Sequence, residues 1–323
     1  MPLRRRDRDT STRPWITRED AALAVELPIL ALLALATPER SWRGACRRLE
    51  GAKARLKLFD PGPVANAAQR VFGTAHPAFD ARGFALDSAA GRSEHHLQIL
   101  RASVAHWAPQ LRLEGRDHLD GALASKHGAV LWVAHFCFNA LATKQAMAAA
   151  GFRAWHLSRP EHGFSKSRIG IATVNRIRVR AELAHLAGRI VIDRAKPMSA
   201  TLAAQRTLKE NGIVSVTAGA WEGQRLAAVR LLGGSLELAV GAPGLARLSG
   251  AVLLPVFTVR VPSGDIRVVI EAPIPVAGEG EKDEVLTAAA QAFADRLEGW
   301  VRRFPEQWRD WKNLKLPAPD SVA

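Results

Sequence analysis

The chain of 323 residues is long enough to bury a large core, and nothing in its composition demands two independent globular units. Its 45 Lys and Arg residues against 31 Asp and Glu residues give a formal net charge of +14, which favours anionic partners such as nucleic acid, anionic lipid or an acidic protein. The sequence has no tyrosine, no zinc-finger spacing and no glycine- and aromatic-rich RNA-binding signature, so we expect no nucleic-acid partner.

The cysteines and the start of the chain indicate the cellular compartment. Cys46 and Cys137 stand in different contexts and lack metal-ligand spacing. The first residues lack the apolar core and the small-residue cleavage site of a signal peptide. We therefore expect a reducing, cytoplasmic setting.

The first 110 residues are predicted to be mostly helical. Residues 1–13 are charged and carry no apolar period, so we expect them to be disordered. Residues 79–91 are rich in Gly and Asp and are predicted to form a loop. Helices are predicted over 38–58, 64–72 and 93–107.

A separate apolar stretch, residues 21–37, reads AALAVELPILALLALAT. As a helix it would be about 25 Å long, but Glu26 and Pro28 interrupt it, so a simple membrane span is not expected. The alternatives are a core helix and a helix in the membrane interface. Basic segments on both sides favour an anionic membrane surface, and we expect residues 1–110 to form a helical, membrane-associating region.

From residue 111 onwards, strands and helices alternate. Strands are predicted over 128–134, 152–157, 189–192, 213–217, 251–259 and 266–271. Helices are predicted over 141–150, 165–186, 198–209, 243–248 and 284–304. The alternation predicts an α/β domain over 111–323, with a mostly parallel central sheet flanked by helices.

One histidine stands at the end of a predicted buried strand. The run from Gly128 to Ala140 reads GAVLWVAHFCFNA, and its apolar first half is typical of a strand that is buried on both faces. His135 would lie at the carboxyl end of that strand, where open α/β sheets bind their ligands. The alternative is a histidine whose ring nitrogens only satisfy hydrogen bonds at a strand end.

Three separated stretches carry a resemblance to a known family. They are Leu113–Leu123 (LEGRDHLDGAL) followed by Gly128–Phe136 (GAVLWVAHF), Leu231–Val256 (LLGGSLELAVGAPGLARLSGAVLLPV), and PEQW at Pro305–Trp308 followed by Trp311 and Lys312. In this order they resemble the bacterial lipid A biosynthesis acyltransferases, the late lauroyl and myristoyl transferases of the lysophospholipid acyltransferase superfamily. The resemblance extends over residues 95 to 312.

The resemblance implies an activity. A fatty acyl chain would pass from an acyl carrier protein or coenzyme A thioester to a hydroxyl of an anionic lipid or glycolipid acceptor, of the lipid A or lipopolysaccharide type or another bacterial lipid. His135 would be the general base, and no metal or other cofactor would be needed. The protein would lie on the cytoplasmic face of the bacterial inner membrane, as a peripheral or monotopic protein.

The sequence departs from the family's catalytic pattern, a histidine followed after four residues by Asp or Glu, because Ala140 occupies the acid position. The carboxylate fixes the imidazole tautomer and stabilises the imidazolium. Asn139 could hold a ring nitrogen without supplying charge. Glu222 could reach the ring from the loop after the fourth strand, although a solvated loop carboxylate is the simpler interpretation of that residue. The missing acid means either that another residue orients the ring or that the protein binds lipid or acyl carrier without turnover.

Basic residues gather after the second strand, along the next helix and after the fourth strand. The candidate substrate-binding residues among them are Arg159, Arg168, Arg178, Arg180 and Arg225. Guanidinium groups bind phosphate bidentately, which would suit a phosphorylated lipid, the phosphopantetheine arm of an acyl carrier, or the acidic carrier itself. The alternative is a solvated basic face.

Overall fold

A seven-stranded sheet runs through the computed structural model, which describes residues 3–6, 13–105, 107–193, 195–219, 223–276 and 280–318. Its order is β2-β10-β9-β3-β6-β4-β5. The strands are β2 (Leu111–Glu114), β3 (Ala129–Val133), β4 (Trp155–Ser158), β5 (Gly188–Val191), β6 (Ile213–Thr217), β9 (Val252–Arg260) and β10 (Ile266–Ile270). The strands from β9 to β5 run parallel, whereas β10 is antiparallel to β9 and parallel to β2. The predicted α/β class with a mostly parallel sheet is confirmed.

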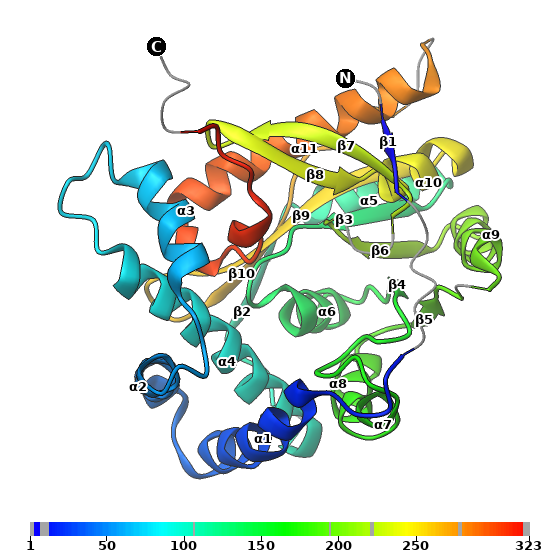
Figure 1. Ribbon diagram of the computed structural model, residues 1–323. Helices are drawn as coiled ribbons and strands as arrows, with labels where there is room; N and C mark the ends of the chain where they lie inside the picture. The colour runs from blue at the N-terminus through cyan, green and yellow to red at the C-terminus, as the bar shows by residue number, and fades with distance from the viewer. Residues whose placement is uncertain are drawn as a thin grey trace.

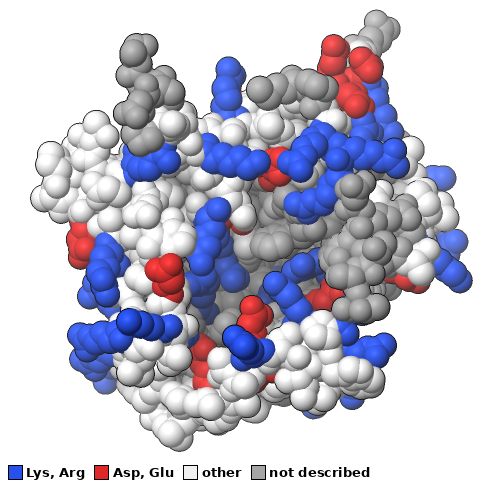
Figure 2. Space-filling model, viewed as in Figure 1, with Lys and Arg blue, Asp and Glu red and all other residues white. Residues whose placement is uncertain are grey.

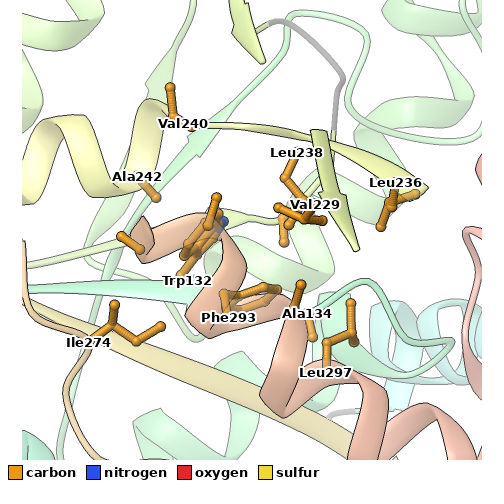
Figure 3. Packing of buried hydrophobic residues seen from close by; sticks show 14 of the residues in the cluster. Trp132, Ala134, Val229, Leu236, Leu238, Val240, Ala242, Ile274, Phe293 and Leu297 are labelled. Atoms are coloured by element: carbon orange, nitrogen blue, oxygen red, sulfur yellow. The ribbon is translucent and has the colours of Figure 1, made fainter. Parts of the chain in front are cut away.

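Helices cover both faces of this sheet (Figure 1). One face is covered by α9 (Pro197–Lys209), α10 (Gly241–Ser249) and α11 (Lys282–Arg303), and the other by α5 (Arg116–Ala124) and α6 (Asn139–Ala149). Every residue of β3 is buried, as its apolar sequence predicts. Trp132 packs towards α11, where its ring stacks on Phe293 with centroids 4.3 Å apart (Figure 3), while Leu131 and Val133 pack on the opposite face.

A second, three-stranded sheet contains β1 (Arg4–Arg5), β7 (Arg225–Leu231) and β8 (Gly234–Ala239). The hairpin of β7 and β8 was not predicted. Leu232 and Gly233 connect its strands with positive φ angles of 51° and 74°, as a tight hairpin turn requires. The prediction of disorder over residues 1–13 is wrong for Arg4 and Arg5, which pair with β7, and residues 1–2 and 7–12 lie outside the described part of the chain.

The region before the main sheet is helical. It consists of α1 (Arg18–Ala36), the 3-10 turn η1 (Glu39–Ser41), α2 (Trp42–Arg55), α3 (Gly62–Phe72) and α4 (Ala81–Ala105). The predicted loop over 79–91 is wrong, because α4 begins at Ala81, where the Asp80 carboxylate accepts from the backbone N–H of Gly83 at 2.8 Å. The small residues that suggested a loop permit close packing instead: a Cβ on Gly91 would lie 3.2 Å from the Sγ of Cys137.

Helix α1 has two different apolar sides. Its buried residues, which pack against α2 and α4, are Leu27, Leu30 and Ala34. Its exposed apolar residues are Val25, Ile29, Leu32 and Leu35. The helix therefore packs in the core on one side and exposes apolar residues on the other. The sequence alternatives, a core helix or a helix in the membrane interface, each described only one of these sides. Among the described helices, none combines the length and the apolar character needed to span a bilayer.

Two further segments complete the fold around the carboxyl ends of the parallel strands. The predicted helix over 165–186 is divided at Thr173 (φ −117°, ψ −89°) into α7 (Arg168–Ala172) and α8 (Val174–Leu183). After α11, the chain forms two short 3-10 turns, η2 (Pro305–Gln307) and η3 (Trp311–Asn313). The residues between these turns pair with the segment that follows β3 through an antiparallel bridge between Phe136 and Trp308.

Candidate active site

His135 follows β3, the middle strand of the main sheet, and its ring contacts an acid. Its Nδ1 lies 3.1 Å from each carboxylate oxygen of Asp310. The side chains of His135 and Asp310 are 12% and 7% exposed, so the pair is shielded from most of the solvent. Because a carboxylate only accepts hydrogen bonds, Nδ1 carries the ring proton and Nε2 carries the lone pair. This is the arrangement of a general base with an orienting acid.

Backbone hydrogen bonds hold the segment of Asp310 against the end of β3. The N–H of Arg309 donates to the carbonyl of His135 at 3.1 Å, and the N–H of Cys137 donates to the carbonyl of Gln307 at 2.8 Å. The side chain of Gln307 exchanges two hydrogen bonds, both of 2.8 Å, with the backbone of Arg260 at the end of β9. These hydrogen bonds therefore hold the segment of Asp310 at the edge of the sheet where the parallel strands β3 and β9 end.

Electrostatics keep the His135 ring neutral at neutral pH. Burial lowers the pKa of His135, the carboxylate of Asp310 opposes this shift, and the positive charges of Arg309 and Arg178 lower the pKa further. The net direction is below the ordinary value of 6.5. Nε2 is then unprotonated at neutral pH and can accept a proton from a hydroxyl, while Asp310 stabilises the imidazolium that results.

The acid was not among the residues predicted to orient the ring. Asn139 is the buried first residue of α6, and Glu222 lies outside the described residues, so their predicted roles stay predictions. Asp310 stands inside the C-terminal stretch that carries the family resemblance, but 175 positions separate it from His135. A rule based on short spacing could not connect them. The available signal was that PEQWRDWK contains two acidic residues, Glu306 and Asp310.

The five arginines predicted to bind substrate lie in different environments. Arg178 donates to Glu182 at 2.7 Å and also lowers the pKa of His135, which places its charge near the site. Arg168 lies at the start of α7, stacked over Trp15 at 4.7 Å. The others are Arg159 after β4, Arg180 on the exposed side of α8, and Arg225, which forms an ion pair with Asp283. Arg309, which the sequence did not single out, directly precedes Asp310 in the chain.

A buried ionic network supports Arg178. Glu182 is completely buried and accepts hydrogen bonds from Arg178, Lys144 and Nε2 of His162, the last at 2.7 Å. Burial lowers the pKa of Lys144 to about 8, and the surrounding positive groups hold the pKa of Glu182 well below its usual value. His156, His162 and Glu182 have ligand atoms within 4.8 Å of one another, but a metal ion there would have to displace the ammonium of Lys144.

Lys and Arg side chains surround the central part of one face of the molecule. Figure 2 shows a hollow in the middle of this face, with basic side chains on both sides, in the region that Figure 1 shows between the β7–β8 hairpin and α6. This positive setting suits an anionic substrate or an acidic partner.

Comparison with known proteins yields similarity to solved structures. No protein-family model and no curated protein sequence matches the chain. Among solved structures, the crystal structure of the 1-acyl-sn-glycerophosphate (LPA) acyltransferase PlsC from Thermotoga maritima is similar, with a TM-score of 0.41 and 11% sequence identity, over 84% of this chain and 100% of that chain. Similarity at this level does not transfer a function, and the functional conclusion depends on the geometry around His135.

Proposed function

We propose that the protein is an acyltransferase that moves a fatty acyl group from a thioester donor to a hydroxyl of a lipid acceptor. The observation that carries the proposal is the contact between His135 and Asp310 at the carboxyl end of the central strand. A neutral, oriented imidazole is the group that this reaction requires. The resemblance of three separated sequence stretches to the lipid A acyltransferases supports the same reaction.

In the proposed reaction, Nε2 of His135 takes the proton of the acceptor hydroxyl while the hydroxyl oxygen attacks the thioester carbonyl carbon. A carbon–oxygen bond forms and the carbon–sulfur bond breaks. The imidazolium, stabilised by Asp310, then returns the proton to the departing thiolate. The donor would be an acyl carrier protein or coenzyme A thioester, and the acceptor an anionic bacterial lipid, of the lipid A type or another class.

The second candidate was a protein that binds lipid or acyl carrier without turnover. That candidate followed from Ala140, which stands where relatives carry the acid. Asp310 provides a carboxylate to the same ring from another segment, so the principal reason for it no longer holds. The geometry therefore favours an enzyme.

The proposed location is the cytoplasmic face of the bacterial inner membrane. The support comes from α1, whose outward side is apolar, and from Trp15 and Ile16 just before it, which are 67% and 62% exposed. Exposed apolar residues between basic segments are typical of a protein that binds the interface of an anionic membrane.

The direct test is acyl transfer by purified protein from radiolabelled acyl-coenzyme A and acyl carrier protein donors to a bacterial lipid extract. We expect His135→Ala to lower the rate by about 10²–10⁴-fold, because general-base catalysis contributes that much. His127→Ala, at an exposed histidine before β3, is the matched control and should leave the rate unchanged. Absence of transfer from every donor, or a rate unaffected by His135→Ala, would refute the proposal.

A further inference from the structure

The carboxylate of Asp310 has a second partner besides the ring of His135. Nδ2 of Asn313 donates to Oδ1 of Asp310 at 3.0 Å, while Nδ1 of His135 lies 3.1 Å from both carboxylate oxygens. Within the described part of the chain, these two side chains are the hydrogen-bond partners of the carboxylate. The ring, the carboxylate and the amide therefore form a connected series of three side chains beside the end of β3.

The start of η3 explains how the carboxylate keeps its contact with the ring. Asp310 directly precedes this turn, a position from which an aspartate usually accepts a hydrogen bond from a backbone N–H of the turn. Its side chain makes no such bond to the described residues of η3. The backbone N–H of Asn313 donates to the carbonyl of Asp310 at 2.8 Å, and the side-chain amide of Asn313 donates to the carboxylate. The carboxylate is thus held at the turn without being drawn away from the ring by a backbone N–H.

The rest of the turn is fixed by contacts that do not involve the side chain of Asn313. Trp308 and Trp311 are both buried, and their rings meet edge to face with centroids 5.1 Å apart. Nε1 of Trp311 donates to the carbonyl of Pro305 at 2.8 Å, and Leu314 is buried as well. Asn313 is exposed and buries little apolar surface. Removal of its amide should therefore affect the carboxylate more than the fold.

A second hydrogen bond to the carboxylate has a direct consequence for the catalytic pair. A carboxylate held only by the imidazole can rotate about its last single bond and accept from water in place of the ring. The amide of Asn313 restricts this rotation through Oδ1 and leaves Oδ2 of Asp310 to accept the Nδ1 proton. Partners of this kind preorganise groups that act in catalysis.

We infer that Asn313 is a positioning residue, whose amide holds the carboxylate of Asp310 against Nδ1 of His135. It acts through Asp310 and takes no part in bond making or breaking. The inference rests on the proposed function for the reaction in which the pair is used. The contact between the amide and the carboxylate does not depend on which substrate is bound.

The first test is the acyl-transfer assay with Asn313→Ala and Asn313→Leu. Both variants remove the amide donor, and leucine nearly keeps the shape of asparagine. We expect each to lower kcat by about tenfold with little change in KM, because a hydrogen bond to a charged group contributes about that much. Asn66→Ala, at an exposed asparagine of α3, is the matched control and should leave kcat unchanged.

A double-variant cycle separates an action through Asp310 from a general effect on the fold. In the Asp310→Asn background, Asn313→Ala should lower kcat by less than about twofold, because the carboxylate that the amide positions is no longer present. The midpoint of urea unfolding should be nearly the same for Asn313→Ala and the wild type. A tenfold loss of kcat in both backgrounds, or full activity of Asn313→Leu, would overturn the inference.

The Nδ1 proton of His135 reports on the same contact without any substrate. Its exchange with water can be followed by NMR in the full-length protein, with the resonance assigned by His135→Gln. We expect exchange to be at least about threefold faster in Asn313→Ala than in the wild type, because a carboxylate that turns away exposes the proton.

This readout separates the inference from the proposed function. An unchanged exchange rate in a protein that transfers acyl groups would overturn the positioning role and leave the proposed function intact. Faster exchange in Asn313→Ala of a protein that transfers no acyl group would support the positioning role and refute the acyltransferase.

Discussion

At the scale of single residues, Asp310 places beside His135 a carboxylate of the kind that the family pattern has at position 140, where this chain has Ala140. A carboxylate orients an imidazole wherever the two side chains meet, so the acid need not follow the histidine by a fixed number of residues. Here the antiparallel bridge between Phe136 and Trp308 brings Asp310 to His135 from the C-terminal segment. Orientation of the imidazole requires contact between the two side chains. It does not require the acid to stand at a particular distance from the histidine in the sequence.

Asp310→Asn tests the role of this carboxylate. The amide can still hydrogen-bond to the ring but cannot stabilise the imidazolium, so we expect kcat to fall by about 10²-fold or more. Because Asp310 raises the pKa of His135, its neutralisation lowers that pKa further. The acidic limb of the pH–rate profile should therefore move to lower pH, since the base stays unprotonated to lower pH. A measured limb that stays in place or moves upward would show that Asp310 does not act on His135.

At the scale of elements, the ionic network around Glu182 connects α6 to α8. Lys144 comes from α6, Arg178 and Glu182 come from α8, and all three side chains are nearly or fully shielded from solvent. Removing one partner of a buried ion pair leaves an uncompensated charge, which is more costly than the loss of an exposed pair. The network also holds the Arg178 guanidinium near His135.

Glu182→Gln should lower the free energy of unfolding by about 3–5 kcal/mol near pH 7. Without Glu182 the pKa of Lys144 falls below its present value of about 8, and the native state then binds fewer protons than the unfolded state, in which lysine titrates at 10.5. The wild-type native state releases the same proton only near pH 8, so the deficit in stability should decrease as the pH rises from 7 to about 8 and change little above that, where Lys144 is neutral in both native proteins. Urea unfolding at several pH values measures it.

Asp120→Asn is the matched control for this prediction, because Asp120 pairs with Arg116 on the exposed surface of α5. This variant should lower the free energy of unfolding by less than about 1 kcal/mol. If Asp120→Asn and Glu182→Gln lowered the free energy of unfolding equally, burial of the ion pair would not be the cause of the larger loss expected for Glu182→Gln.

At the scale of the whole molecule, the exposed side of α1 lies far from the β7–β8 hairpin and at one end of the molecule (Figure 1). This apolar side is available for contact with a membrane, while the opposite side of the helix packs against α2 and α4. Folding and the proposed membrane contact would therefore depend on different residues of the same helix, so that the two could be changed separately.

The double variant Val25→Ser with Leu32→Ser should weaken binding to vesicles containing anionic lipid by about tenfold or more, because two large apolar side chains no longer enter the interface. Both residues are about two-thirds exposed, at 65% and 68%, so the fold should be unaffected. Co-sedimentation with vesicles measures the change.

Met198→Ser with Leu202→Ser on α9 is the control, since these residues are also exposed, at 63% and 57%, but lie on another helix. An equal loss of binding in the two double variants would indicate nonspecific adsorption and exclude α1 as the membrane-binding element.

The sequence by itself determined the central strand and the position of His135. Local apolar patterning is enough to identify a buried strand such as β3, because every side chain of such a strand must be apolar, and a polar residue directly after it lies at the edge of the sheet. The same patterning predicted β6, β9 and α11 close to their observed bounds. It failed at the first half of α4, where glycines that usually indicate a loop allow close contact with Cys137.

Only the tertiary structure decided which acid meets His135 and which arginines act on it. Asp310 and Arg309 come from a segment at the C-terminal end of the chain, and Arg178 comes from α8. No local pattern predicts these contacts, because they depend on how the segment between η2 and η3 pairs with the residues that follow β3, and on how α8 packs against α4 and α6. Local periodicity specifies which face of an element is buried, whereas contacts between distant side chains are specified only when the elements pack together.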